Sequence, residues 1–339
     1  MSMDGQGSKL YAILVTYRRN TELMTTLAKI ADQTRQPDRL ILIDNASNPR
    51  TETVAMLASD GFAAPPVYIS MPENVGYTGG VRAGMIRLLE IADDEDWIVV
   101  CDDDDPPRSR DAFADLVRFA EEMLKRDPRT AGVGFGGGRF DFRRGQIVRV
   151  PTDELHGPVP LDYIGGNSFG CYRVGALRDV GPWSADIFFG FSEGEFGLRL
   201  GRAGYVLWGD GDTWRERRIA DGRADHVMSP RRRLPPVGWR RYYSLRNVIW
   251  ILRQHGRTGV ALRVSLVRGI GKPLANLPLT PRVAIRHLRI NARAIRDAWT
   301  NRMGRRVEPI PWGRRPDETE IVPSILDRVR SEIDALRLD

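Results

Sequence analysis

Four consecutive carboxylates, Asp102–Asp105, are the strongest candidate for chemistry in this sequence. They directly follow the apolar segment Trp97–Cys101, and charges of one sign at such close spacing make burial costly unless a cation neutralises them. Carboxylates one residue apart can converge on Mg²⁺ or Mn²⁺, which keep open coordination positions for phosphate oxygens. The alternative is a solvated acidic turn, but the apolar strand before it favours a metal site.

A second candidate is the segment Asn74–Gly80, whose sequence is NVGYTGG and which leads into a helical pattern. Glycines allow the backbone to approach a ligand closely, and the first turn of a helix presents N–H groups to phosphate. Glycines before helices are common, so this segment indicates a phosphate site only in combination with other evidence.

The third candidate is Phe188–Arg199, in which aromatic residues surround Glu193. Partial desolvation by these rings would raise the pKa of Glu193, as a general base requires. Alternatively, Glu193 and Glu195 are acids in the first turn of a helix, where the helix dipole favours them. The sequence leaves both interpretations open.

Short apolar runs that alternate with helical patterns predict how these residues are positioned. We expect strands at Leu10–Val15, Leu40–Ile43, Val67–Ser70 and Trp97–Cys101, with helices between them, hence a parallel sheet covered on both faces. Ligands bind beyond the carboxyl ends of such strands. Polar residues follow each strand there: Thr16, Tyr17 and Arg18; Asp44 and Asn45; Glu73 and Asn74; and Asp102 to Asp105.

Composition excludes several classes of protein. With 339 residues, 42% hydrophobic and 28% charged, the chain is long enough for a core and unlike disordered or collagen-like sequences. Its two cysteines, Cys101 and Cys171, cannot form a disulfide framework or a structural zinc site, which favours a reducing, cytosolic setting. The sequence shows no signal-peptide pattern and no apolar run of the ~20 residues that span a bilayer.

The charge is divided unevenly along the chain. Residues 229–315 contain 21 Lys and Arg against two acids, a net charge of +19, whereas the whole chain carries +7, so the remainder carries −12. Trp239–Gln254 and Pro281–Trp299 read as basic helices joined by a Gly- and Pro-containing stretch. We therefore predict an acidic domain at 1–228 and a basic, mainly helical region at 229–339 that meets an anionic partner.

Taken in chain order, these motifs resemble the family-2 glycosyltransferases, and within that family the actinobacterial galactofuranosyltransferases. The resemblance is carried by Val15–Arg18, Ile43–Asn45, Asn74–Gly76 with Gly79 and Gly80, Asp102–Asp104, Glu193–Arg199 and Tyr242–Asn247. It implies a GT-A fold, an α/β architecture with a Rossmann-like, mostly parallel sheet and flanking helices, here followed by the basic helical C-terminal region.

The resemblance also implies roles for individual residues. Glu193 matches the catalytic base, although the base is usually Asp and usually follows an acid, where this chain has Ser192. Mn²⁺ or Mg²⁺ would be held by Asp102, Asp104 and His226, the last on the assumption of an insertion around residues 215–223. The donor-binding residues implied are Asp44, which would bind uridine, with Thr16 and Arg18 near it, and Asn74, Gly76 and Asp103.

The implied activity is inverting transfer of galactofuranose from UDP-galactofuranose to a cell-envelope glycan or polyprenyl-linked acceptor. A dTDP-rhamnose enzyme of the same family is the alternative donor class. The two cysteines and the basic region without a membrane-spanning run predict, independently of the resemblance, a cytoplasmic protein whose basic region rests on anionic lipid at the inner face of the plasma membrane.

Two other classes are weighed against this one. A nucleotidyltransferase normally has a basic, glycine-rich loop after its first strand, whereas Thr16–Asn20 contains no glycine. A nucleic-acid-binding protein would use the basic region, which lacks a recognition motif, and the acidic remainder would repel phosphate. We therefore expect no nucleic-acid partner.

Overall fold

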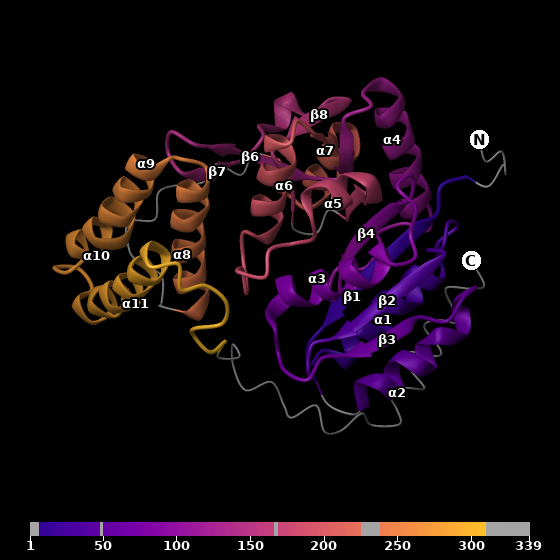
Figure 1. The fold of residues 1–339 in the computed structure, drawn as a ribbon, viewed down its shortest axis with the longest axis horizontal. Helices are drawn as coiled ribbons and strands as arrows, with labels where there is room; N and C mark the ends of the chain where they lie inside the picture. Colours follow the sequence, from indigo (N-terminus) through magenta and orange to yellow (C-terminus); the bar gives the residue numbers. More distant parts are fainter. Residues whose placement is uncertain (1–6, 48–49, 166–168, 225–237, 310–339) are drawn as a thin grey trace.

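The computed structural model describes residues 7–47, 50–165, 169–224 and 238–309. These form an eight-stranded sheet in the order β3-β2-β1-β4-β10-β5-β11-β8, a three-stranded sheet in the order β7-β6-β9, and flanking helices (Figure 1). The α/β architecture predicted from the sequence, a mostly parallel sheet followed by a helical C-terminal region, is confirmed.

The first half of the chain builds the parallel part of the large sheet. Its strands pair in parallel, β1 with both β2 and β4 and β2 with β3. The elements are β1 (Leu10–Thr16), α1 (Asn20–Ala31), β2 (Arg39–Asp44), α2 (Arg50–Leu57), β3 (Val67–Ser70), α3 (Gly76–Leu89) and β4 (Trp97–Asp102).

The second half completes the sheet with two antiparallel strands that the sequence analysis did not predict. β10 (Gly170–Arg173) runs antiparallel between β4 and β5 (Thr130–Gly134), and β8 (Pro158–Leu161) is antiparallel to β11 (Val206–Asp210). The other elements are α4 (Ala112–Arg126), β6 (Gly137–Asp141), β7 (Gln146–Val148), β9 (Tyr163–Ile164), α5 (Val174–Val180), α6 (Ser192–Arg202) and α7 (Gly211–Ala220).

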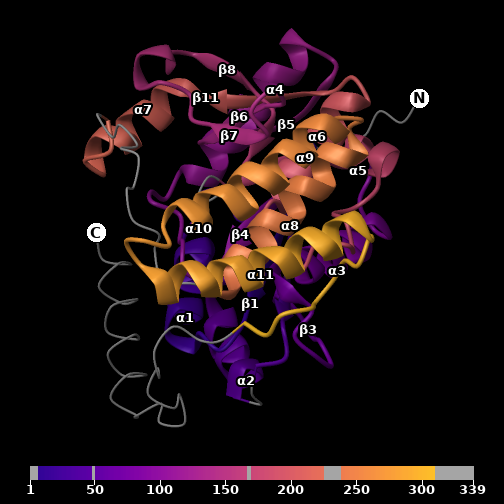
Figure 2. The same cartoon turned by 90° about the vertical axis from the view of Figure 1, so that its left-hand side faces the viewer.

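The C-terminal helices gather on one side of the sheet, with α10 and α11 foremost in Figure 2. The two predicted basic helices are α8 (Trp239–Gln254) and α11 (Pro281–Trp299), and the stretch between them, predicted only as a linker, is itself largely helical. It contains α9 (Thr258–Arg263), the π-helical segment η3 (Val264–Gly271) and α10 (Lys272–Ala275). No helix among the described residues has the length and apolar character to cross a bilayer.

An apolar cluster joins these helices to the rest of the fold. Tyr243 and Ile249 of α8 share it with Phe188 and Leu198 from the α6 region. The predicted division into 1–228 and 229–339 remains a prediction, because the proposed boundary falls in residues 225–237, outside the described part of the chain.

Helix α3 packs unusually close to β1 because it presents glycines to the strand. A Cβ atom on Gly84 would lie 2.7 Å from Ile13 Cγ2, and one on Gly80 would lie 2.7 Å from Val15 Cγ1. These distances are shorter than normal van der Waals contacts, so both positions require glycine. The close packing sets the amino end of α3 beside the carboxyl end of β1.

Replacing Gly84 by Ala therefore tests this packing. We expect Gly84→Ala to lower the free energy of unfolding by about 1–3 kcal/mol, because the added methyl group overpacks the interface with Ile13. The matched control is Gly201→Ala in α6, where a Cβ meets no atom within 4 Å and where the helix gains about 0.5 kcal/mol. Thermal and denaturant unfolding would measure both; equal effects at the two positions would contradict the packing argument.

Candidate functional site

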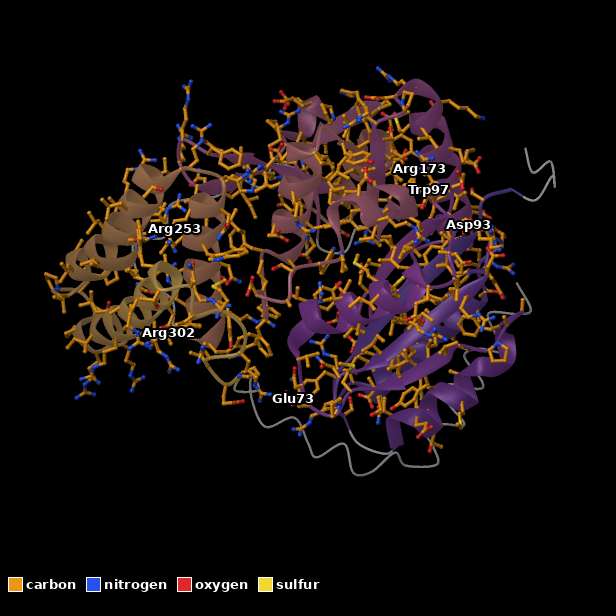
Figure 3. The ribbon with its side chains drawn as sticks, viewed as in Figure 1. Glu73, Asp93, Trp97, Arg173, Arg253 and Arg302 are labelled. Carbon is orange, nitrogen blue, oxygen red and sulfur yellow. The ribbon has the colours of Figure 1, made fainter. Side chains whose placement is uncertain are left out.

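The carboxyl ends of three adjacent strands meet at one edge of the sheet. In the strand register, Thr16 lies opposite Asp44, and Val15 lies opposite Asp102. Figure 3 shows Glu73 near the C-terminal helices, whereas Trp97, where β4 begins, and Asp93 before it lie on the far side. The edge that carries the acidic residues therefore faces the helical region.

Asp103 is buried beneath this edge and is bound by its own neighbours. Thr16 Oγ1 donates a hydrogen bond to Asp103 Oδ2 over 2.9 Å, and Arg19 Nη1 donates to Asp103 Oδ1 over 3.0 Å. Burial raises the pKa of Asp103 to about 6, against the opposing effects of Arg19 and Thr16. Both carboxylate oxygens are thus used to fix the loop after β1.

Asp104 is nearly half exposed, and it forms an ion pair with the same Arg19. One guanidinium therefore neutralises two of the consecutive carboxylates. The sequence analysis missed Arg19. Its position three residues beyond the first strand, at the predicted edge, was the only available signal.

Asp102 turns the other way, toward α3 and α6. Burial raises the pKa of its carboxyl to about 7, with further increases from Glu193, Asp104 and Asp103 and an opposing effect of the Tyr77 hydroxyl beside it. Burial, Asp102 and Glu193 raise the pKa of Tyr77 well above its usual value. Tyr77, within the segment Asn74–Gly80, was also missed by the sequence analysis, which considered Asn74 and the glycines of this segment.

A small pocket lies where Asp102 and Glu193 face each other. Its acidic lining is Asp102, Asp105 and Glu193, and its aromatic lining is Tyr77, Phe169, Tyr172 and Trp183. Burial raises the pKa of Glu193. The structure thus brings the acidic cluster and the third candidate segment together at one site, and it adds Asp105 to them.

Glu193 is the second residue of α6, so it is both an acid in a first helical turn and a wall of the pocket. The two interpretations left open by the sequence are therefore compatible. The helix start is anchored on two sides. Thr78 Oγ1 and Ser192 Oγ lie 2.8 Å apart and join α3 to α6, and Asn247 of α8 donates to the backbone oxygens of Phe189 and Gly190 over 2.9 and 2.8 Å.

Asp44 also forms hydrogen bonds within the protein. Its carboxylate accepts hydrogen bonds from the Ser47 backbone N–H at 2.9 Å and from the Tyr68 hydroxyl at 2.5 Å. Arg18 is exposed, has a left-handed backbone with φ of 55°, and donates its N–H to Ser47 Oγ. The predicted uridine-binding residues thus lie together where the turn after β1 meets the turn after β2.

The loop before α3 is organised by Asn45 and Asn74. Asn45 Oδ1 accepts the Val75 N–H, and Asn74 Oδ1 accepts the Gly76 N–H, each over 2.9 Å. Gly76 has φ of +79°, and a Cβ there would lie 2.1 Å from Phe188 O. These two N–H groups are already hydrogen-bonded, so in this conformation the segment is less open to phosphate than the sequence indicated.

The C-terminal region also reaches this edge. Arg305 Nη1 donates to Asn74 O over 3.0 Å, and its guanidinium lies 5.9 Å from the centre of the Phe188 ring. Arg246 of α8 supports the same stretch by donating to Gly304 O. Nothing in the sequence pattern of Arg305 marked it as a neighbour of Asn74, because 231 residues separate the two.

The Glu195–Arg199 part of the family motif holds the wall of the pocket. Arg199 pairs with Glu195 through two hydrogen bonds of 2.9 and 3.1 Å, and it also donates to the backbone oxygens of Gly181 and Pro182. The residue after Pro182 is Trp183, which lines the pocket. This motif therefore positions the pocket wall.

The carboxylates suit a divalent cation in part. Burial and three neighbouring carboxylates raise the pKa of Asp102, which means that its charged form is costly in free energy. A bound cation would reduce this cost. Among the described residues, however, no group of three His, Cys, Asp or Glu side chains is arranged to hold a metal ion. His226, the third ligand implied by the resemblance, lies outside the described residues.

Residues 11–153, which span β1 to β7 and include the whole acidic cluster, match the model of "Glycosyl transferase family 2". The chain resembles a family-2 glycosyltransferase. The resemblance predicted from the motifs is confirmed.

Two similar proteins are the galactofuranosyltransferases GlfT1 of Mycolicibacterium smegmatis and Mycobacterium tuberculosis. The first is 31% identical over 147 residues, which cover 42% of this chain and 47% of that protein. The second is 29% identical over 205 residues, which cover 58% and 65%. The chain therefore matches about half to two thirds of the length of these relatives.

Two solved structures are also similar. The mannosyltransferase PcManGT of Pyrobaculum calidifontis, in complex with GDP-Man and Mn²⁺, aligns over 98% of this chain and 81% of its own, with 13% identity and a TM-score of 0.49. GalNAc-T7, with UDP, GalNAc and Mn²⁺, aligns over 61% and 43%, with 12% identity and a TM-score of 0.46.

Arg199→Lys tests the clamp on the pocket wall. Lysine keeps the charge but loses the fork that binds Glu195 and the carbonyls of Val180, Gly181 and Pro182 at once. We expect a loss of about 1–3 kcal/mol in the free energy of unfolding and a changed fluorescence of the tryptophans, of which Trp183 lies at the pocket. Arg118→Lys, at an exposed ion pair, is the control and should be near neutral; equal losses in both variants would refute the clamp.

Proposed function

We propose that this protein is a metal-dependent, inverting glycosyltransferase whose donor is a nucleotide sugar, with UDP-galactofuranose first and a dTDP-rhamnose donor as the alternative. The observation that carries the proposal is the shared pocket of Asp102 and Glu193. A nucleotide-sugar reaction needs positive charge at the leaving diphosphate and a proton acceptor at the attacking hydroxyl. Asp102 can bind a cation that supplies the positive charge, and Glu193 can accept the proton.

Asp102 and Asp104, with His226, would hold Mn²⁺ or Mg²⁺ in this proposal. A bound divalent ion supplies Lewis-acid stabilisation of the negative charge on the departing diphosphate. Asp104 would have to exchange its contact with Arg19 for the ion, and the exposure of that pair makes the exchange inexpensive in free energy.

The donor would lie along the edge formed by the ends of β1 and β2. Asp44 and Thr16 stand side by side in the strand register, with Arg18 on the adjoining turn and Asn74 and Gly76 on the loop before α3. Asp103, whose oxygens are bound by Thr16 and Arg19, would contribute by fixing that edge.

Glu193 would accept the proton of the acceptor hydroxyl as this attacks the anomeric carbon. Burial raises its pKa, so it binds a proton more strongly than an exposed carboxylate does. With Asp102 committed to the cation, a single displacement follows, and the anomeric configuration is inverted. The acceptor we propose is a cell-envelope glycan or a polyprenyl-linked sugar, reached at the inner face of the plasma membrane.

Glu193→Gln separates catalysis from folding. The amide keeps the size of the side chain but cannot take the proton, so we expect the rate of sugar transfer to fall about 10²–10⁴-fold with donor binding retained. Glu216→Gln, on an exposed position of α7, is the control and should transfer sugar at the wild-type rate. A Glu193→Gln enzyme with unchanged kcat at saturating donor would rule out this base.

A thermal-shift panel of nucleotide sugars tests the donor and the metal together. The cognate donor with Mn²⁺ should stabilise the fold by about 2.7 kcal/mol at a hundredfold excess over its Kd, and Asp102→Asn should lose the Mn²⁺-dependent part of this shift. Stabilisation by UDP-galactofuranose that is the same with and without Mn²⁺ would contradict metal dependence. Stabilisation by nucleoside triphosphates alone would favour a nucleotidyltransferase.

A further inference from the structure

The outer face of the C-terminal helices carries an unusual concentration of exposed apolar side chains. Seven of the thirteen exposed large apolar side chains in the described part of the chain lie between residues 262 and 285. Six of them belong to α9, η3, α10 and the turn that follows: Leu262, Leu266, Val267, Ile270, Leu274 and Leu279. Leu266 and Val267 are 51% and 58% exposed.

Four of these residues form one continuous row along the helical stretch. Leu262, Leu266, Ile270 and Leu274 are spaced four residues apart, which places them on one side of a helix. Because α9, η3 and α10 follow one another without a break from Thr258 to Ala275, the row runs the length of the stretch. The opposite side, which includes Ala261 and Val264, is buried against the other helices.

The row is held firmly in place. A Cβ on Gly269 would lie 2.6 Å from Ile295 Cδ1, so η3 packs directly against α11. Asn291 of α11 joins three elements, since it donates to Gly269 O over 2.8 Å and accepts from Arg241 Nε of α8 over 3.1 Å. The apolar row is therefore part of a packed three-helix arrangement.

Basic residues border this row on the adjacent helix. Arg282, Arg286 and Arg289 are exposed and lie with Ile285, itself 43% exposed, on one side of α11. Lys272 of α10 is exposed as well, and none of these four basic residues forms an ion pair among the described residues. From residue 258 to residue 296 the chain contains no acid. Figure 2 shows α10 and α11 side by side on the face turned to the viewer.

We propose that this face, which we call the apolar–basic face (Leu262, Leu266, Val267, Ile270 and Leu274 with Lys272, Arg282, Arg286 and Arg289), docks onto an anionic lipid bilayer. A partly inserted row of aliphatic side chains beside Arg and Lys is the pattern that binds the boundary between headgroups and acyl chains. The proposal extends that of a lipid-linked acceptor but rests on this face alone, because membrane binding does not require sugar transfer.

Charge and side-chain type distinguish this occupant from others. A symmetric contact with a second copy of the chain would place its arginines against one another, without an acid to pair them. Nucleic acid would engage the basic side chains but leave the aliphatic row without a partner, since base stacking uses aromatic side chains. An anionic bilayer satisfies both parts of the face at once.

The experiment is co-sedimentation of the full chain with vesicles of phosphatidylcholine, with and without phosphatidylglycerol. We expect binding only with phosphatidylglycerol, weakened by salt. Arg282→Glu/Arg286→Glu should weaken it at least about 25-fold, at about fivefold for each charge lost. The control is Lys125→Glu/Arg215→Glu, an equal charge change at exposed positions on α4 and α7, which should bind nearly as the wild type does.

Leu266→Glu tests the apolar row in the same assay, with Met56→Glu, at another exposed position, as its control. We expect Leu266→Glu to weaken binding at least about tenfold and Met56→Glu to leave it unchanged, with thermal unfolding checking that both fold. Loss of binding in both charge-reversal pairs alike, or no binding by the wild type, would overturn the proposal. So would a concentration-dependent dimer that Leu266→Glu dissociates while vesicle binding persists. Transfer of sugar to a soluble acceptor by the Leu266→Glu variant would show that the proposed activity stands independently.

Discussion

The structure around the site depends on how the carboxylates after β4 are kept apart and neutralised. Asp103 and Asp104 share Arg19, whereas Asp102 lines the pocket together with Tyr77. This division leaves one desolvated carboxylate facing Glu193 across a pocket. With Asp102 and Glu193 buried in one pocket, the state in which both are ionised is costly in free energy. Binding of a divalent cation together with an anionic substrate would offset this cost.

The C-terminal helices support the same pocket through hydrogen bonds to the backbone before α6. Asn247 of α8 holds the backbone just before α6, and so fixes where Glu193 stands. Tyr242 of the same helix donates to the buried Asp297 of α11 over 2.6 Å, which ties α8 to the helix that carries the basic side of the apolar–basic face. One set of helices thus supports the proposed base on its inner side and the proposed membrane contact on its outer side.

Much of this arrangement was predictable from the sequence, because it depends on local pattern. The four parallel strands were predicted from short apolar runs that alternate with helical patterns. Because the strands are parallel, their carboxyl ends bring Thr16, Asp44 and Asp102 to one edge of the sheet. The helical limits of α8 and α11 likewise follow from residue spacing.

The remainder depends on contacts between distant residues. Whether an acid points toward Arg19 or toward Tyr77 is decided by the turn after β4, and consecutive aspartates carry no signal of it. The sequence indicated a phosphate site at Asn74–Gly80, yet Gly80, like Gly84 further along α3, is needed where the helix meets β1. The helical stretch at η3 was missed because glycines and a proline interrupt its pattern, and packing against α11 compensates for them.

The anomeric configuration of the product tests the central claim most directly, because it reports how the pocket of Asp102 and Glu193 works. Transfer from a nucleotide sugar of defined configuration would be followed by NMR of the new glycosidic bond. The account predicts that the anomeric centre is inverted, as a single displacement assisted by one base requires. A product that retains the configuration of the donor would contradict it.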